Sequence, residues 1–318
     1  MIIERIIPNL GTVTDTPVQS SITSGYWKAF YTLPSGRVLA GSDGNSGVWY
    51  SDDNGKTWTQ SDLTSDAWYS FCVTQTGRVI VVGALDIAYS DDNGEHWTSL
   101  SLSGGAWYAL CISHTGRVFA AGDDILYSDD NGEHWTSCNT EKSWLSICVT
   151  HSGRIIAGGG GSLQLNYGVW QSDDNGATWL QNTVLNSGMW HALCITPTGR
   201  ILTCYGLYSD DDGDTWSQSE VVEDWQYFYI IPGQNTIIAN YYYSTDNGIS
   251  WEELTYLFDD PDSNYYRICA AKDNTIILGC NNGIWYVDPI VQMDATRYVT
   301  KAGVAELVAQ AKAYIDSL

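Results

Sequence analysis

The sequence predicts an all-β protein, a seven-bladed β-propeller, on three observations. An eight-residue motif, Ser-x-Asp-x-Gly-x-x-Trp, occurs six times, and its serines are spaced 39, 38, 44, 37 and 35 residues apart. That spacing is typical of a four-stranded propeller blade rather than of a helical repeat. Seven hairpin signatures accompany the six motifs, and the segment before the first blade resembles the outer strand that the last blade lacks.

The repeated motif, called the box motif below, is predicted to form a turn. Its Ser and Asp oxygens can bond turn amides, its Gly tolerates a left-handed backbone, and its Trp can pack between strands. We therefore expect a structural role for four residues in each copy: Ser51, Asp53, Gly55, Trp58, Ser90, Asp92, Gly94, Trp97, Ser128, Asp130, Gly132, Trp135, Ser172, Asp174, Gly176, Trp179, Ser209, Asp211, Gly213, Trp216, Ser244, Asp246, Gly248 and Trp251.

Each repeat has the strand pattern of one blade. In the third repeat, residues 107–113, 117–121, 125–127 and 134–138 are β-rich runs separated by Gly, Asn and Asp turns. The hairpin between first and second strands contains Arg in five repeats and Asn-Thr in two. These markers are Arg37, Arg78, Arg117, Arg154, Arg200, Asn235-Thr236 and Asn274-Thr275.

The seventh repeat ends near residue 288, before a fourth strand. Residues 16–27 align with residues 57–68, so the amino-terminal segment is expected to complete blade 7. Pairing the two ends would close the ring and leave no open edge. The predicted organisation is an arm over 1–15, a propeller over 16–288 and a linker with a helix over 289–318. The helix, with an apolar stripe from Val304 to Leu318, would dock on the ring or mediate oligomerisation.

Composition restricts the partners. The formal net charge is −23, which disfavours nucleic acids and anionic membranes. No apolar run resembles a secretory signal or a membrane span, so we expect synthesis in the cytoplasm and no membrane insertion. Five cysteines occupy equivalent positions in successive repeats and are expected to be free thiols. They are Cys72, Cys111, Cys148, Cys194 and Cys269.

The box motif resembles the Asp-box, or bacterial neuraminidase repeat (BNR). Similar repeats occur in sialidases, xyloglucanases, sortilin-type receptors, photosystem assembly factors and some lectins. The resemblance implies the propeller fold and a box at the rim, away from the active face, but it transfers no activity. Residues 298–316 are similar to short helical segments of phage tail-fibre and baseplate-associated proteins. That second resemblance implies a virion appendage.

The candidate binding residues lie where first strands begin, near the mouth of the central channel. Each blade has an aromatic residue there: Trp27, Trp68, Trp107, Trp144, Trp190, Trp225 and Tyr265. Aromatic faces beside polar groups suit sugar rings. A residue present in every blade also fits a packing role, so the variable next residue is the better discriminator of a ligand. The predicted ligand-binding set is Trp68, Tyr69, Trp107, Tyr108, Trp144, Trp190, His191, Trp225 and Tyr266.

No catalytic, metal or cofactor site is predicted. A sialidase-type site needs three converging arginines, but five arginines lie in hairpin turns on the other face and only Arg267 is near the channel. The box turns lack the ligand series of a calcium loop, and the histidines form no predicted metal cluster. A glycosidase needs two carboxyls about 5–10 Å apart. Nothing selects a pair among Asp66, Glu223, Asp224, Asp260 and Asp262.

The sequence therefore favours a non-enzymatic binding propeller that recognises a glycan or a host-surface receptor in a phage tail or receptor-binding appendage. Its other expected partners are a virion or tail protein, or a second copy of the chain, through the carboxy-terminal helix. Two alternatives stay open. One is an Asp-box glycoside hydrolase of sialidase or xyloglucanase type, and the other is a structural or assembly scaffold.

Overall fold

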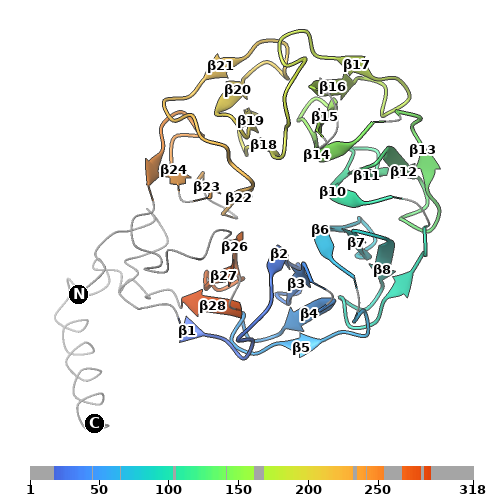
Figure 1. Ribbon diagram of the computed structural model, residues 1–318, viewed down its shortest axis with the longest axis vertical. Helices are drawn as coiled ribbons and strands as arrows, with labels where there is room; N and C mark the ends of the chain where they lie inside the picture. Colours follow the sequence, from blue (N-terminus) through green and yellow to red (C-terminus); the bar gives the residue numbers. More distant parts are fainter. Residues whose placement is uncertain are drawn as a thin grey trace, which may run out of the picture.

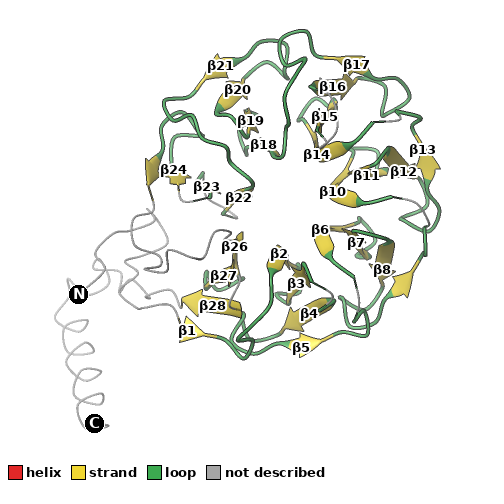
Figure 2. Cartoon of the chain, in the orientation of Figure 1, coloured by secondary structure: helices red, strands yellow, loops and turns green. Residues whose placement is uncertain are grey.

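Seven four-stranded antiparallel sheets surround a central axis in the computed structural model (Figure 1). The structure describes residues 18–44, 46–64, 66–102, 105–140, 142–160, 168–231, 235–240, 242–253, 267–280 and 283–287. These residues form strands, loops and turns only (Figure 2). The predicted all-β, seven-bladed propeller is confirmed. The predicted arm and carboxy-terminal helix lie outside the described residues.

Blades 1–6 follow chain order from the axis outward, with inner strands of three to six residues and outer strands of two. Blade 1 consists of β2 (Trp27–Thr32), β3 (Val38–Ser42), β4 (Val48–Ser51) and β5 (Thr59–Gln60). Blade 2 consists of β6 (Trp68–Val73), β7 (Val79–Gly83), β8 (Ile87–Ser90) and β9 (Thr98–Ser99). Blade 3 consists of β10 (Trp107–Ile112), β11 (Val118–Gly122), β12 (Ile125–Ser128) and β13 (Thr136–Ser137). Blade 4 consists of β14 (Trp144–Val149), β15 (Ile155–Gly159), β16 (Val169–Ser172) and β17 (Leu180–Gln181). Blade 5 consists of β18 (Leu193–Ile195), β19 (Ile201–Thr203), β20 (Leu207–Ser209) and β21 (Ser217–Gln218). Blade 6 consists of β22 (Phe228–Ile230), β23 (Ile237–Ala239), β24 (Tyr242–Ser244) and β25 (Glu252–Glu253). Among the described residues no helix is long and apolar enough to cross a membrane.

Blade 7 combines both ends of the ring. Its inner strands are β26 (Arg267–Ala270), β27 (Ile276–Cys280) and β28 (Gly283–Val287), and its outer strand is β1 (Val18–Gln19). β1 pairs antiparallel with β28. The Ser20 amide donates to the Ile284 carbonyl at 2.9 Å, and the Ile284 amide donates to the Ile22 carbonyl at 3.1 Å. The predicted closure by an amino-terminal strand is confirmed.

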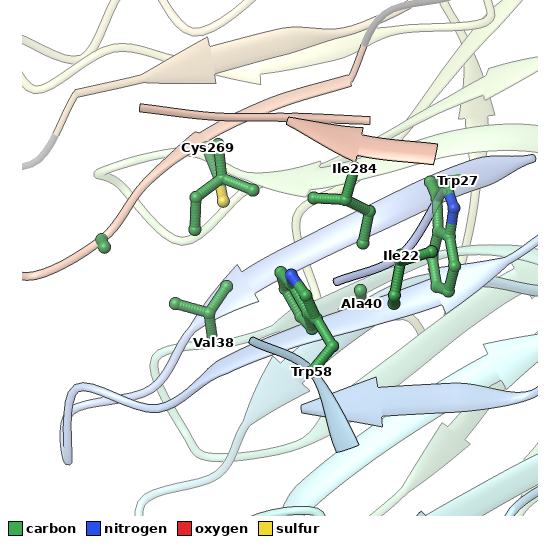
Figure 3. Packing of buried hydrophobic residues seen from close by; sticks show 9 residues of the cluster. Ile22, Trp27, Val38, Ala40, Trp58, Cys269 and Ile284 are labelled. Atoms are coloured by element: carbon green, nitrogen blue, oxygen red, sulfur yellow. The ribbon is translucent and has the colours of Figure 1, made fainter. Parts of the chain in front are cut away.

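The core consists of clusters between neighbouring blades, because each sheet buries both faces against the next. Figure 3 shows the cluster at the closure, where Ile22 and Ile284 pack with residues of blades 1 and 7. Ile22 is 8% exposed, so the closing segment contributes apolar burial as well as hydrogen bonds. Its neighbours include Trp27, Val38, Ala40, Trp58 and Cys269.

The box motif forms the predicted turn. In the first copy, the Ser51 hydroxyl donates to Asp53 Oδ1 and accepts the Gly55 amide, both at 2.8 Å. The Trp58 indole donates to the Gly55 carbonyl at 2.9 Å. Gly55 has φ +91, and a Cβ there would lie 2.7 Å from Ile277 Cδ1 of blade 7. The turn therefore requires glycine for its backbone angle and for its packing on the preceding blade.

The turn's hydrogen bonds hold the box carboxylates in the ionised form. In the second copy, partial burial alone would raise the pKa of Asp92, but bonds from the His96 amide, the His96 ring and the Ser90 hydroxyl lower it to about 2. The pKa of Asp130 is also lowered to about 2, although burial opposes the change.

The hairpin arginines tie each blade to the next. Arg78 donates to both carboxylate oxygens of Asp91 in its own blade, at 2.7 and 2.9 Å, and to the Asn131 carbonyl of blade 3 at 3.4 Å. Its guanidinium lies over the Tyr89 ring at 4.0 Å. The other hairpin arginines pair with aspartates of acidic turns in the same way, and these pairs are Arg37–Asp52, Arg117–Asp129, Arg154–Asp173 and Arg200–Asp210.

Replacing this inter-blade link should measurably destabilise the ring. Arg78→Met keeps much of the side-chain volume but removes the bidentate bond and the contact to blade 3. We expect the free energy of unfolding to fall by about 1–3 kcal/mol. Urea denaturation measures it, and Arg78→Lys should give an intermediate value because it keeps the charge without the planar fork. Wild-type stability in the Met variant would contradict an energetic role for the link.

Candidate functional site

Four of the inner strands have an irregularity at their second residue. In β2, β6, β10 and β14 the pairing register shifts around that residue, as between Trp27 and Ala29 in β2. Such an irregularity is a β-bulge, which redirects a side chain locally. The second residues of these four strands are Lys28, Tyr69, Tyr108 and Leu145. The bulge gives their side chains a different direction from those of their neighbours.

A central cavity of about 540 Å³ lies on the axis and is lined by all seven blades. Positions are counted here from the aromatic residue of each repeat that aligns with Trp27. The second-position residues on the cavity wall are Lys28, Tyr69, Tyr108, Leu145, His191 and Gln226. Third-position residues are Ala29, Ser70, Ala109, Ser146, Ala192, Tyr227 and Arg267. The structure thus brings the predicted Tyr69, Tyr108 and His191 to one cavity. The predicted Tyr266, like Tyr265, lies outside the described residues.

The tryptophans at the first position do not face this cavity. Trp68 and Trp225 are 1% exposed and Trp144 is 0% exposed, and Trp107 and Trp190 are also buried in clusters between blades. Buried indole faces cannot stack on a sugar ring. The expectation that Trp68, Trp107, Trp144, Trp190 and Trp225 bind ligand is therefore corrected: these five side chains pack, and the second position carries the binding hypothesis.

Two tyrosines and an ion pair form one side of the cavity. The rings of Tyr69 and Tyr108 stack with centroids 5.7 Å apart and planes 20° apart. The Lys28 ammonium lies 3.3 Å from Asp43 Oδ2. Burial, then the charges of Asp43, Tyr108 and Asp66, raises the pKa of Tyr69 to about 12. Its phenol therefore stays neutral, with an apolar face and a hydroxyl.

Asp43 is a cavity residue that the sequence interpretation missed. It lies in the link between β3 and β4, at the same end of the ring as the start of each inner strand. Its amide donates to the Tyr26 carbonyl at 2.6 Å, which fixes it beside the entrance to blade 1. The sequence could have pointed to it, because the link from the second to the third strand of a blade lies at the same end as the start of the inner strand.

The candidate carboxylates that the structure describes, Asp66, Glu223 and Asp224, do not form a pair in the cavity wall. Asp66 accepts the Ala67 amide at 2.7 Å and the Leu85 amide at 3.1 Å, which gives it a role in the turn. Glu223 and Asp224 are exposed, and neither is among the described residues that line the cavity. The other two candidates, Asp260 and Asp262, lie outside the described residues.

Among the residues that the structure describes, one group of possible metal ligands lies together. Side-chain ligand atoms of Asp130, Glu133 and His134 are within 4.8 Å of one another, all exposed. The sequence interpretation did not predict this cluster. The box turn itself explains it, because Asp130 already accepts bonds from the amides of Glu133 and His134 and from the Ser128 hydroxyl.

The cysteines of the inner strands are free thiols, as predicted. Cys72, Cys148 and Cys269 are buried, whereas Cys111 and Cys194 are partly buried. Burial raises the pKa of Cys72 and of Cys194 to about 12. Such thiols remain protonated near neutral pH and act as small packing residues.

The comparisons agree with the repeat and the fold. The BNR/Asp-box repeat family model matches residues 49–60 and 242–253. This chain carries BNR/Asp-box repeats. No curated protein matches it in sequence.

Solved propellers resemble the chain in fold alone. The extracellular domain of the putative one component system BT4673 from B. thetaiotaomicron has a TM-score of 0.66 at 11% identity, over 85% of this chain and 39% of that chain. YCF48 bound to D1 peptide gives 0.63 at 16% identity, over 89% and 99%. A catalytically inactive virginiamycin B lyase from Staphylococcus aureus, with Quinupristin, gives 0.66 at 12% identity, over 86% and 99%. The chain thus spans about two fifths of the first of these.

Proposed function

We propose that this chain is a non-enzymatic binding propeller whose central cavity receives a glycan. The observation that carries the proposal is the stacked Tyr69–Tyr108 pair on the wall of a cavity of about 540 Å³. That volume lies in the range of small-molecule sites, roughly 300–1,000 Å³. Tyrosine faces favour the C–H faces of sugars, while His191 and Gln226 on the same wall can bond hydroxyls.

The cavity wall supports binding better than hydrolysis. Glycoside hydrolysis uses two carboxyl groups flanking the scissile bond. Among the described residues, Asp43 is the one carboxylate that lines the cavity, and it is engaged with Lys28. A single ion-paired carboxylate can orient a hydroxyl, but it does not supply both an acid and a base or nucleophile.

Similar folds support a binding role in general terms. YCF48 was solved with a D1 peptide and the lyase with Quinupristin, so propellers of this shape hold quite different molecules. The ligand class for this chain therefore has to come from its own cavity residues. A place in a phage tail or receptor-binding appendage remains part of the proposal, based on the helical pattern of residues 298–316.

A glycan array with product analysis tests this function. Tyr108→Ala removes half of the stacked pair, and we expect it to weaken retention at least tenfold, or about 1.4 kcal/mol. His191→Ala should weaken retention of the same glycans, with thermal stability close to wild type in both variants. Leu180→Ala, at an exposed outer-strand residue, is the control. Unchanged retention in both cavity variants would refute the site, and release of shortened glycans would replace binding by hydrolysis.

A further inference from the structure

Arg267 differs from every other arginine that the structure describes. The five hairpin arginines each donate to an aspartate through Nε at 2.6–2.7 Å. Arg267 instead donates through Nε to the Lys28 carbonyl at 3.1 Å, and its guanidinium lies over the Tyr227 ring at 4.6 Å. Within the described residues it makes no ion pair, although it lines the central cavity.

The fold does not require an arginine at this place. Arg267 is the third residue of its repeat's inner-strand segment, and the other six blades have different residues there. They are Ala29, Ser70, Ala109, Ser146, Ala192 and Tyr227, all of which also line the cavity. Five of these are small, so six repeats form the same strand without a cation. Arg267 therefore contributes something that strand formation and blade packing do not need.

Its surroundings leave its charge uncompensated. Burial lowers the pKa of Arg267, and the Tyr227 hydroxyl only partly opposes that effect. A charge removed from water is unfavourable without a carboxylate partner. The neighbouring cation, Lys28, is already engaged with Asp43. Among the described cavity residues, Arg267 is thus the permanent cation that remains available to an anion.

We propose that the glycan carries a carboxylate, which binds the Arg267 guanidinium while its ring reaches toward the Tyr69–Tyr108 side of the cavity. This inference rests on the proposed glycan-binding function and adds the charge of the ligand. The planar guanidinium matches a carboxylate through two parallel hydrogen bonds, and such pairs strengthen where water is excluded. Hexuronic acids and other acid-terminated sugars have this chemistry.

The net charge of −23 makes this mode distinguishable from surface attraction of a polyanion. An anion on an exposed basic patch binds more weakly as salt rises. Here the surface repels the ligand, and the favourable contact lies inside the cavity. Salt at about 0.15 M screens exposed charges beyond about 8 Å but affects a buried pair much less. Affinity should therefore hold or rise with added salt.

Matched glycans separate the charge from the sugar ring. Oligosaccharides ending in glucuronate, galacturonate or sialate are compared with the same molecules after methyl esterification of each carboxylate. We expect the wild-type chain to prefer an acidic form at least tenfold over its ester. Arg267→Met should bind both forms equally, and Arg267→Lys should recover part of the preference. Lys272→Met, which removes one exposed positive charge from the blade 7 hairpin, should keep the wild-type preference.

The outcomes distinguish the two proposals. Equal binding of acid and ester by wild type, or a preference that persists in Arg267→Met, overturns the carboxylate inference and leaves glycan binding intact. Retention of no glycan, acidic or neutral, refutes the proposed function and the inference with it. Thermal unfolding supplies a separate check, since loss of an unpaired, partly buried charge should leave the melting temperature of Arg267→Met unchanged or higher. A fall of several degrees would make Arg267 a structural residue and overturn the inference.

Discussion

A chain that starts at residue 24 is expected to lose a large part of its stability, because it lacks the outer strand of blade 7. The truncation removes β1, the bonds between residues 20–22 and Ile284, and the buried Ile22 side chain. Truncating one buried isoleucine to alanine typically costs about 2–5 kcal/mol. Loss of the whole segment should therefore cost about 5 kcal/mol, a large part of the roughly 5–15 kcal/mol that stabilises a typical domain.

Urea denaturation and light scattering measure both consequences of this truncation. An uncovered β28 edge offers unpaired backbone groups to other chains, so the truncated protein should also aggregate. A chain starting at residue 16 keeps the closing strand and should match the full-length protein. A synthetic peptide of residues 16–26, added in excess, should raise the melting temperature of the truncated chain. Full stability without residues 1–23 would show that the ring does not depend on this closure.

The fold could be predicted because its signals are local and repeated. Each box turn depends on hydrogen bonds within eight residues, such as Ser51 with Asp53 and Gly55, so the motif marks each blade separately. The closure was predictable for the same reason, since residues 16–27 align with an outer strand and the start of the next blade. The inter-blade role of Arg78 followed only in part: its aspartate lies nearby in sequence, but its carbonyl partner lies 53 residues away.

The site was predictable in position and only partly in identity. Aligning the repeats placed Tyr69, Tyr108 and His191 at one level of the channel, where the structure has them. Alignment could not show that a bulge makes Trp68 and Tyr69 point in different directions, so that Trp68 is buried between blades. The sequence also could not show that Arg267 makes no ion pair within the described residues, because the packing of the ring decides which groups surround it.

Trp144→Ala is expected to destabilise the protein strongly while leaving ligand affinity unchanged. Trp144 is 0% exposed, packs edge-to-face on Trp170 with centroids 6.2 Å apart, and donates its indole N–H to Thr140 Oγ1 at 2.9 Å. Truncating a buried tryptophan leaves a cavity and costs about 3–5 kcal/mol. Chemical denaturation measures the loss. Glycan retention, assayed at a temperature where the variant is folded, should equal wild type.

Tyr108→Ala should give the opposite pattern, with lost retention and nearly unchanged stability, because its ring lines the cavity instead of filling the space between blades. Comparing Trp144→Ala with Tyr108→Ala therefore separates packing between blades from ligand recognition in the cavity. If Trp144→Ala, while folded, also lost glycan retention, Trp144 would have to position the cavity residues indirectly, through the bulge that follows it. If both variants lost stability equally, Tyr108 would be a packing residue and the cavity would need a different ligand-contacting wall.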